Sequence, residues 1–154
     1  MSDAELLKKL KDPFEAKFVK WRVGATTQDK TQGIALAYID AREVMKRLDD
    51  VFGVTGWQCR YSQVTDKGVV CEIGAKIGDE WVWKANGAGD TDVEAEKGAM
   101  SDAFKRAAVL WGVGRYLYYL PNEWKPIKPS GRSHKLVGTP TLPNWALPRK
   151  EATK

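Results

Sequence analysis

The sequence predicts an α+β fold: an N-terminal helix, a β-hairpin, a second helix, a three-stranded antiparallel meander and a long helix, followed by a disordered basic tail. Helix-start signals of the capping-box type occur three times along the chain. Stretches in which apolar and polar residues alternate, as in half-buried strands, lie between them. From Pro121 onward, prolines recur among Gly, Ser and Lys, which is typical of extended or disordered segments.

The N-terminal third is predicted as helix, hairpin and helix. The Ser-Asp-Ala-Glu box at 2–5 starts a short helix that ends before Pro13. Residues 16–39 contain two alternating stretches joined by a polar loop, and these predict a hairpin. An Asp-Ala-Arg-Glu box then starts a helix over 41–52, which Gly53 ends.

The middle of the chain is predicted as an antiparallel meander. Alternation begins at Trp57 and resumes after a turn at 66–68. A Gly-Asp dipeptide at 78–79 signals the next hairpin. Trp81 and Trp83 open the third strand, and we expect both in the core.

The long helix over 92–111 is predicted to present a basic pair. On a helical wheel, Met100 and Trp111 belong to the apolar face, whereas Lys105 and Arg106 lie on the opposite side, about 100° apart. We therefore expect this helix to pack on the meander and to show its basic pair outward.

The net charge of +5 is unevenly distributed. Residues 125–154 hold seven of the 25 Lys and Arg but one of the 20 acidic residues, so their net charge is +6 and that of residues 1–124 is −1. We therefore divide the chain into a core domain, 1–124, and a Pro-rich basic flexible tail, 125–154. A basic site on the core must arise from local clustering of charges.

Composition argues against several classes of protein. The chain has no apolar run of about 18 residues and its N-terminus is acidic, so we expect no membrane span and no signal peptide. Cys59 and Cys71 are too few for a disulfide framework and indicate a reduced, cytoplasmic setting. A single histidine with two separated cysteines does not make a zinc site, and we expect no metal and no cofactor.

The glycine-rich turn at 87–89 admits two enzymatic interpretations. It could cradle a nucleotide phosphate, but no Gly-Lys-Ser/Thr follows it. Acidic residues cluster just after it, which leaves a magnesium-dependent nuclease as an alternative, although the helix dipole also favours acids there. We predict no catalytic residue.

Two blocks of sequence carry a family resemblance. The first is Tyr-Ile-Asp-Ala-Arg at 38–42, leading into Val-Phe-Gly-Val-Thr-Gly-Trp at 51–57. The second is Glu-Lys-Gly-Ala-Met-Ser-Asp-Ala-Phe-Lys-Arg-Ala at 96–107. In order and spacing, these blocks resemble the Rad fifty-two family of single-strand annealing recombination proteins over about residues 16–120, in a compact form that fits a phage or bacterial protein.

The resemblance implies a DNA-binding role. The family binds single-stranded DNA in a basic groove around a ring of subunits and pairs complementary strands without ATP. By position, Lys105 and Arg106 match the inner-groove helix, Arg22 matches a groove arginine on the first hairpin, and Arg42 matches an arginine at the start of the second helix. A second, outer site would depend on Lys67, but the segment before the last helix is shorter here than in the family. The predicted DNA-binding residues are Arg22, Lys105, Arg106, Lys20, Arg42, Lys97 and Lys67.

Spacing alone leaves other roles open for these residues. Lys20 and Arg22 share a strand face, and they would line one cleft with the helix pair if the hairpin lay beside that helix. Otherwise the helix pair would be solvated charges paired with Asp102 or Glu94, and Arg42 would pair with Asp40 or Asp49. Lys20 would then be an ordinary exposed strand charge.

We expect a non-enzymatic protein that binds single-stranded DNA and anneals complementary strands in recombination and repair, as an oligomeric ring in a bacterial host cell. A non-annealing single-strand binding protein is the alternative, followed by the nuclease. Candidate further partners are a host single-strand binding protein or a recombinase. Tyr116, Tyr118 and Tyr119 fit either a subunit boundary or a core. The tail would attract DNA electrostatically, bind a partner or do neither.

Overall fold

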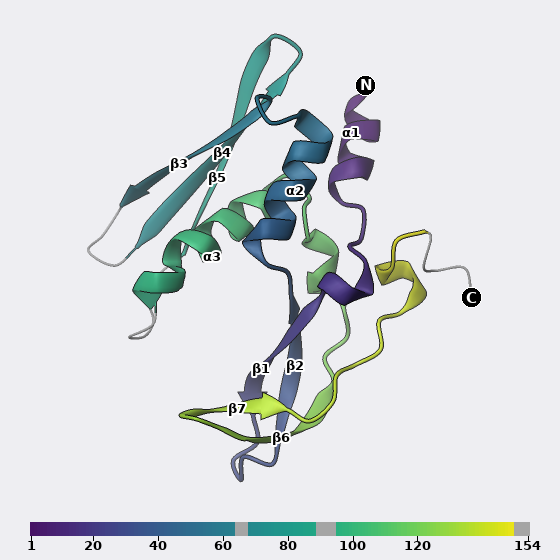
Figure 1. The fold of residues 1–154 in the computed structure, drawn as a ribbon, viewed down its shortest axis with the longest axis vertical. Helices are drawn as coiled ribbons and strands as arrows, with labels where there is room; N and C mark the ends of the chain where they lie inside the picture. The colour runs from purple at the N-terminus through teal and green to yellow at the C-terminus, as the bar shows by residue number, and fades with distance from the viewer. Residues whose placement is uncertain (64–67, 89–94, 150–154) are drawn as a thin grey trace. The chain divides into compact units, whose positions relative to one another are not determined.

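The computed structural model describes residues 1–63, 68–88 and 95–149, with side chains in the last helix described from Gly98 onward. It confirms the α+β class, with three α-helices and two antiparallel sheets in the described residues (Figure 1). The chain forms two compact units. The first contains Met1–Asp12 and Ala41–Arg115, and the second contains Pro13–Asp40 and Tyr116–Lys154. Each unit has its own sheet.

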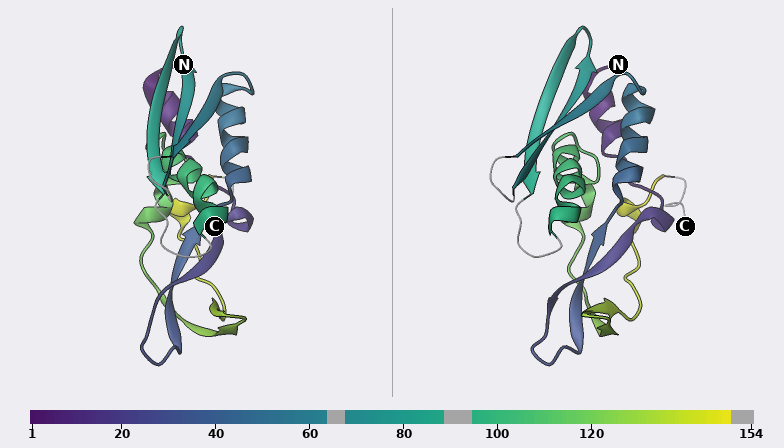
Figure 2. Two further views of the ribbon diagram at one scale, coloured as in Figure 1. Left: turned by 90° about the vertical axis from the view of Figure 1, so that its left-hand side faces the viewer. Right: turned by 60° about the vertical axis from the view of Figure 1, so that its left-hand side comes forward.

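The first unit consists of three helices and the predicted meander. Its sheet has the strand order β3-β4-β5, and α3 lies along one face of it (Figure 2). The elements are α1 (Asp3–Leu10), α2 (Ala41–Phe52), β3 (Trp57–Gln63), β4 (Val69–Ile77), β5 (Glu80–Ala88) and α3 (Ala95–Leu110).

Local signals begin and end these elements as the sequence predicts. The Ser2 hydroxyl accepts a hydrogen bond from the Glu5 amide at 3.2 Å, which caps α1. Gly53 follows α2 with φ of 80°, and Gly78 turns the β4–β5 hairpin with φ of 64°. Both are left-handed conformations that glycine adopts without steric cost.

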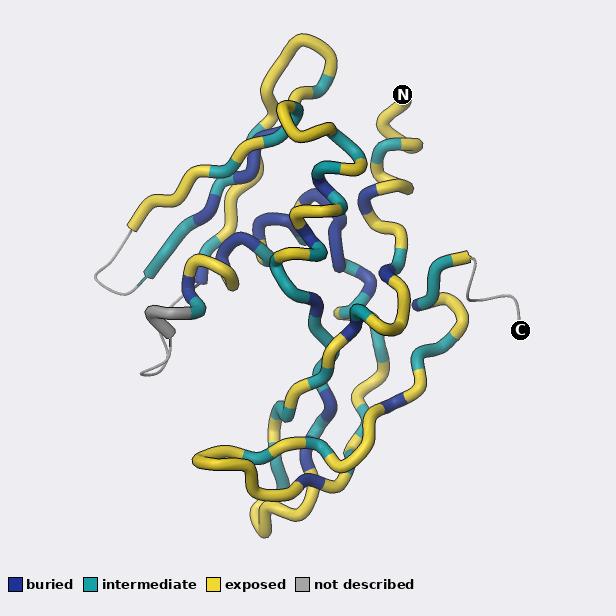
Figure 3. The backbone as a smooth tube through the Cα atoms, in the orientation of Figure 1, coloured by how far each residue is buried: buried dark blue, intermediate teal, exposed yellow. Residues whose placement is uncertain are grey.

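The core of the first unit lies between β4 and α3. Cys71, Ile73 and Ala75 of β4 are completely buried on one face of the central strand. Ala103 and Ala107 of α3 are also completely buried. Figure 3 shows buried backbone on both the meander and α3. Because these helical residues are small, the helix can pack closely on the sheet. This packing holds α3 in position against β4.

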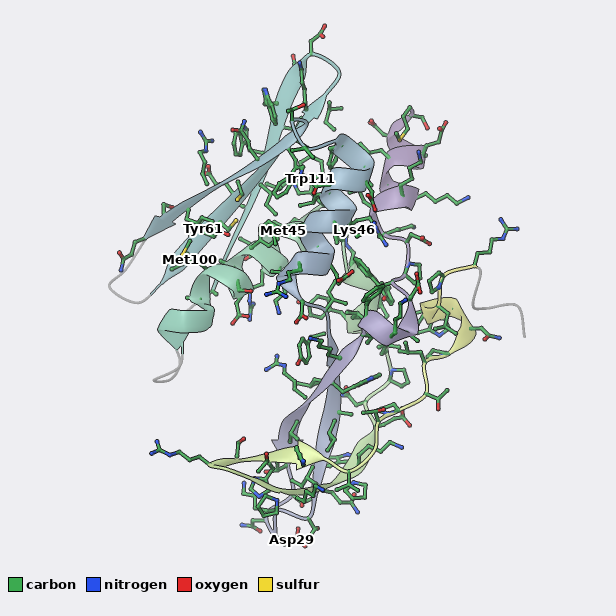
Figure 4. All side chains as sticks on the ribbon, viewed as in Figure 1. Asp29, Met45, Lys46, Tyr61, Met100 and Trp111 are labelled. Carbon is green, nitrogen blue, oxygen red and sulfur yellow. The ribbon has the colours of Figure 1, made fainter. Side chains whose placement is uncertain are left out.

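The core assignment of three residues differs from the sequence prediction. Met100 is 52% exposed, because the buried face of α3 is centred on the alanines at 99, 103 and 107 and Met100 lies beside it (Figure 4). Trp81 is exposed and Trp83 is half-buried. Since Lys84 is the residue that pairs with the buried Ile73, both tryptophans lie on the sheet face away from α3.

The second unit contains a four-stranded antiparallel sheet with the order β1-β2-β6-β7. The predicted hairpin provides β1 and β2, and the chain after residue 123 provides β6 and β7. The strands are β1 (Lys20–Thr26), β2 (Gln32–Tyr38), β6 (Trp124–Ser130) and β7 (Ser133–Leu136), with short 3₁₀ turns η1 (Ala16–Phe18), η2 (Arg115–Tyr119) and η3 (Asn144–Ala146).

The expectation of a flexible tail does not hold for residues 125–149. Trp124 pairs with Ile34 of β2, and the Ala35 amide donates to the carbonyl of residue 123 at 3.0 Å. Ile127 of β6 is buried, and a methyl group placed on Gly33 would lie 3.2 Å from its Cγ2. The regular prolines suggested disorder, but apolar residues between them are sufficient to hold the segment on β2. Residues 150–154 lie outside the described part of the chain.

Candidate nucleic-acid interface

The basic pair of α3 stands on a rigid base. Lys105 is half-buried and Arg106 is exposed, while the neighbouring Phe104 and Ala107 are buried. The Phe104 ring packs against the ring of Trp57 with centroids 5.9 Å apart. Arg106 therefore points outward as expected, whereas Lys105 lies beside the buried stripe of the helix and not on the side opposite to it. Among the described residues Arg106 makes no ion pair, whether with Asp102 or with any other acid.

The end of α3 is held by an arginine that sequence analysis did not single out. Arg115 donates from Nε to the Val109 carbonyl at 3.0 Å and from Nη2 to the Leu110 carbonyl at 2.9 Å. The last carbonyls of a helix lack partners within it, so the guanidinium bonds to both of them, alongside the Gly112 amide that donates to the Val109 carbonyl at 2.9 Å. The positive charge of Arg115 also interacts favourably with the negative end of the helix dipole. The sequence signal that could have revealed this cap is an arginine that directly follows the glycines at the end of the helix.

The hairpin candidates lie on one face of β1. Lys20 pairs in register with Tyr38, and Arg22 with Leu36. Lys20 forms an ion pair and hydrogen bond with Asp40, so part of its charge is already compensated. Arg22 is exposed and keeps its guanidinium available at the surface. Of the two, Arg22 is therefore the stronger phosphate ligand.

Arg42 occupies the first turn of α2 and is exposed. The two acids that could have neutralised it are engaged elsewhere. Asp40 pairs with Lys20, and Asp49 accepts a hydrogen bond from the indole Nε1 of Trp57 at 2.7 Å. A cation in a first turn is disfavoured by the helix dipole, so Arg42 adds little to helix stability and remains available to an anion.

The remaining candidates are only partly described. Lys67 lies outside the described residues, as do Gly89, Asp90 and the rest of the acidic stretch through residue 94. Lys97 belongs to α3, but its side chain is not described. The nucleotide and nuclease interpretations of this segment are therefore not tested. Within the described ranges no three His, Cys, Asp or Glu side chains are grouped to hold a metal ion.

The candidates belong to different units. Lys20 and Arg22 lie in the second unit, whereas Arg42, Lys105 and Arg106 lie in the first. A single cleft lined by all of them stays a prediction. Within the described residues no helix has the length and apolarity needed to cross a membrane.

The face of the meander that points away from α3 carries a basic residue that was not among the sequence candidates. Arg60 of β3 stacks its guanidinium 3.7 Å from the ring centroid of Trp83 and pairs with Glu72 at 3.1 Å. The ring of Trp81 lies beside that of Trp83, with centroids 6.4 Å apart. Alternate residues of a strand point to opposite faces, and Arg60 and Trp83 are each one position away from a residue that pairs with Ile73. This alternation is the signal that would have placed their side chains together.

The two thiols, Cys59 and Cys71, are free. Cys71 is completely buried, and burial raises the pKa of its thiol to about 12, with the neighbouring Cys59 adding to the rise. Burial also raises the pKa of Tyr61, on the adjacent strand. Cys71 therefore stays neutral at physiological pH and belongs to the core, whereas the Tyr61 side chain is partly exposed.

Comparison with known proteins places this geometry in a family. Residues 3–135 match the Rad52/22 family double-strand break repair proteins. The single-stranded DNA-binding protein DdrA of Deinococcus deserti is 37% identical over 157 residues, which cover 98% of this chain and 74% of that protein. The single-stranded DNA-binding protein DdrA of Deinococcus radiodurans is 36% identical over 159 residues, covering 99% and 73%. With the predicted element order and both resembling blocks inside the matched range, the chain belongs to the Rad52/22 family.

Proposed function

We propose that the protein binds single-stranded DNA and anneals complementary strands without ATP, as an oligomeric ring acting in recombination and repair. The observation that carries this proposal is the basic pair Lys105 and Arg106 on the anchored helix α3, within a chain whose relatives are named single-stranded DNA-binding proteins. The core involved is residues 1–124, with Arg22 and Arg42 as further phosphate ligands.

The chemistry of such a site is electrostatic. Cations spaced along a rigid element attract phosphates irrespective of base sequence, and each contact releases condensed counterions. An arginine fork contacts phosphate oxygens in a fixed plane, so it also orients the backbone. If the phosphates face the protein, the bases remain exposed, and a second strand can test its pairing. No bond is made or broken in this step, so the proposal needs no catalytic group and no cofactor.

The direct test is the double variant Lys105→Ala with Arg106→Ala. Loss of two phosphate contacts would weaken binding of an oligothymidylate by roughly 60-fold at about 50 mM salt and by about tenfold at about 200 mM salt. The matched control is Lys8→Ala with Lys9→Ala, an adjacent basic pair exposed on α1 of the same unit. If both double variants bound alike, α3 would not be the DNA-binding element.

A second function is favoured by the names of the relatives, which state binding and not annealing. The protein would then protect single strands without pairing them. An annealing assay with two complementary oligonucleotides separates the two functions, because a purely protective protein would not accelerate pairing over the protein-free rate. Incubating a labelled single strand with Mg²⁺ and scoring cleavage tests the nuclease alternative in the same samples.

The ring is tested by the mass of the native particle, measured with and without a long single strand. A defined multiple of the protomer mass supports the ring, and a monomer under both conditions contradicts it. Tyr118 and Tyr119 are exposed, unlike the buried Tyr116, so they are the aromatic candidates for a subunit boundary. A host single-strand binding protein or a recombinase remains a proposed further partner.

A further inference from the structure

The hairpin formed by β6 and β7 places two like charges directly opposite each other. Lys128 of β6 pairs in register with Lys135 of β7, and both side chains are exposed. The next pair along the ladder, Ile127 with Leu136, points to the other face, where Ile127 is buried. The two lysines therefore project together from the outer face of a hairpin whose inner face is anchored.

This arrangement is unfavourable by itself. Like charges directly opposite on antiparallel strands destabilise the pairing. Residues 125–149 contain no aspartate or glutamate, and in the described part of the chain neither lysine forms an ion pair. Arg132, exposed at the tip of the same hairpin, adds a third positive charge. A bound anion would relieve this repulsion, and the folded hairpin holds the charges in place for one.

We propose that the outer face of the β6–β7 hairpin is an additional contact site for the phosphate backbone of single-stranded DNA, with Lys128 and Lys135 as its ligands. This inference rests on the proposed function and extends it to a segment outside the 1–124 core. Arg132 continues the positive surface toward the tip.

The other side chains on this face favour nucleic acid over a protein partner. The pair Ser130 and Ser133 follows the lysine pair on the same face, and hydroxyl groups are common phosphate ligands. The paired residues on this face are lysines and serines, and the exposed large apolar side chains nearby, Trp124 and Val137, lie beyond the end of the ladder. Protein interfaces depend on such side chains as buried anchors, whereas phosphate binding does not.

The variant Lys135→Glu separates a binding role from a structural one. It replaces a repulsive cross-strand pair by an attractive one, so the melting temperature should rise by about 1–3 °C. Affinity for an oligothymidylate should nevertheless fall, by at least about eightfold at about 50 mM salt and about threefold at about 200 mM salt. Changes in opposite directions cannot result from loss of folding.

Two further variants complete the experiment. Lys8→Glu makes the same change in net charge on α1, to which the proposal assigns no phosphate contact, and it should leave the affinity within about twofold of wild type at about 200 mM salt because salt screens charges that make no direct contact. Lys128→Gln with Lys135→Gln removes both ligands without adding negative charge, and should reduce the slope of log affinity against log salt by about 1.4.

The outcomes distinguish this inference from the proposed function. If wild type binds the oligonucleotide and Lys105→Ala with Arg106→Ala weakens binding, but Lys135→Glu binds as tightly as Lys8→Glu, the hairpin site is overturned and the function stands. If wild type does not bind, the proposed function fails. If Lys135→Glu instead abolishes binding of a polyglutamate chain while DNA binding is unchanged, the hairpin serves an acidic protein partner and the proposal is wrong.

Discussion

The indole Nε1 of Trp111 donates a hydrogen bond to the backbone carbonyl of Ile73, at 3.1 Å. Both residues are buried, so the bond connects the chain just after α3 to the central strand of the meander. The Phe52 ring meets the Trp111 ring edge-on at 5.7 Å, and Lys84 lies 5.2 Å from it. Trp111 therefore holds the C-terminal end of α3 in place against the meander.

We predict that Trp111→Phe lowers the free energy of unfolding by about 1–3 kcal/mol, because it removes the indole hydrogen bond to the buried Ile73 carbonyl. Chemical denaturation measures the change. Trp145→Phe is the matched control, since Trp145 is 52% exposed and its replacement should have little effect. Equal effects of the two substitutions would show that the hydrogen bond does not contribute.

We predict that Arg47→Met destabilises the first unit by about 1–3 kcal/mol. The Nη1 atom of Arg47 lies 2.9 Å from the Leu10 carbonyl oxygen and 2.7 Å from that of Asp12, and so it caps the end of α1. Lys46→Met, at the preceding position, is the control, because Lys46 is exposed and its ion pair with Asp50 lies at the surface. Thermal unfolding of both variants provides the measurement, and a null result for Arg47→Met would contradict the capping role.

Two glycine substitutions should act in opposite directions. A Cβ on Gly74 would lie 2.7 Å from ring atoms of Trp83, so Gly74→Ala should displace that ring from Arg60 and cost about 1–3 kcal/mol. In contrast, a Cβ on Gly98 meets its nearest atom, of Asp102, at 3.8 Å, so Gly98→Ala in α3 should stabilise by about 0.5–1 kcal/mol. Unfolding midpoints and tryptophan fluorescence of the two variants test the prediction. If both substitutions lowered the stability, the predicted difference between the two sites would be wrong.

Stability should decrease in alkali through Cys71. Its folded pKa of about 12 lies above the ordinary thiol pKa of 9.0, so the unfolded chain loses the proton first as pH rises. The stabilising contribution of the neutral thiol is therefore present below pH 9.0 and is lost between pH 9.0 and about 12. Cys71→Val should flatten this part of the pH profile. The wild-type slope persisting in that variant would assign the effect to other groups.

The element order could be predicted because its signals are local. A capping serine at position 2, glycines at 53 and 78 and strand alternation each act within a few residues. The pairing of Ile34 with Trp124 could not be predicted, because it joins segments 90 positions apart and the prolines of β6 concealed its alternation. Alternation also did not reveal which face of β5 meets α3, and the error in placing Trp81 and Trp83 follows from that.

The candidate site was predictable to a similar degree. Helical spacing correctly kept Lys105 and Arg106 out of the buried stripe, since periodicity determines which residues share a face, but it did not show that Lys105 would be half-buried. The ion pair between Lys20 and Asp40 depends on how the chain turns after β2, which no local pattern specifies. The like-charged pair of Lys128 and Lys135 depends on the register of a hairpin that the composition had suggested was disordered.

The pairing of β6 with β2 has a consequence for how the protein can be shortened. A chain ending before residue 123 would lose the acceptor of the Ala35 amide and the strand that covers β2. An uncovered strand edge is a template for pairing with any other extended chain, including another copy of itself. Truncation at the start of the Pro-rich segment would therefore produce a fragment that self-associates through the exposed edge of β2. The particle size of such a fragment would reflect this edge pairing and not the native assembly.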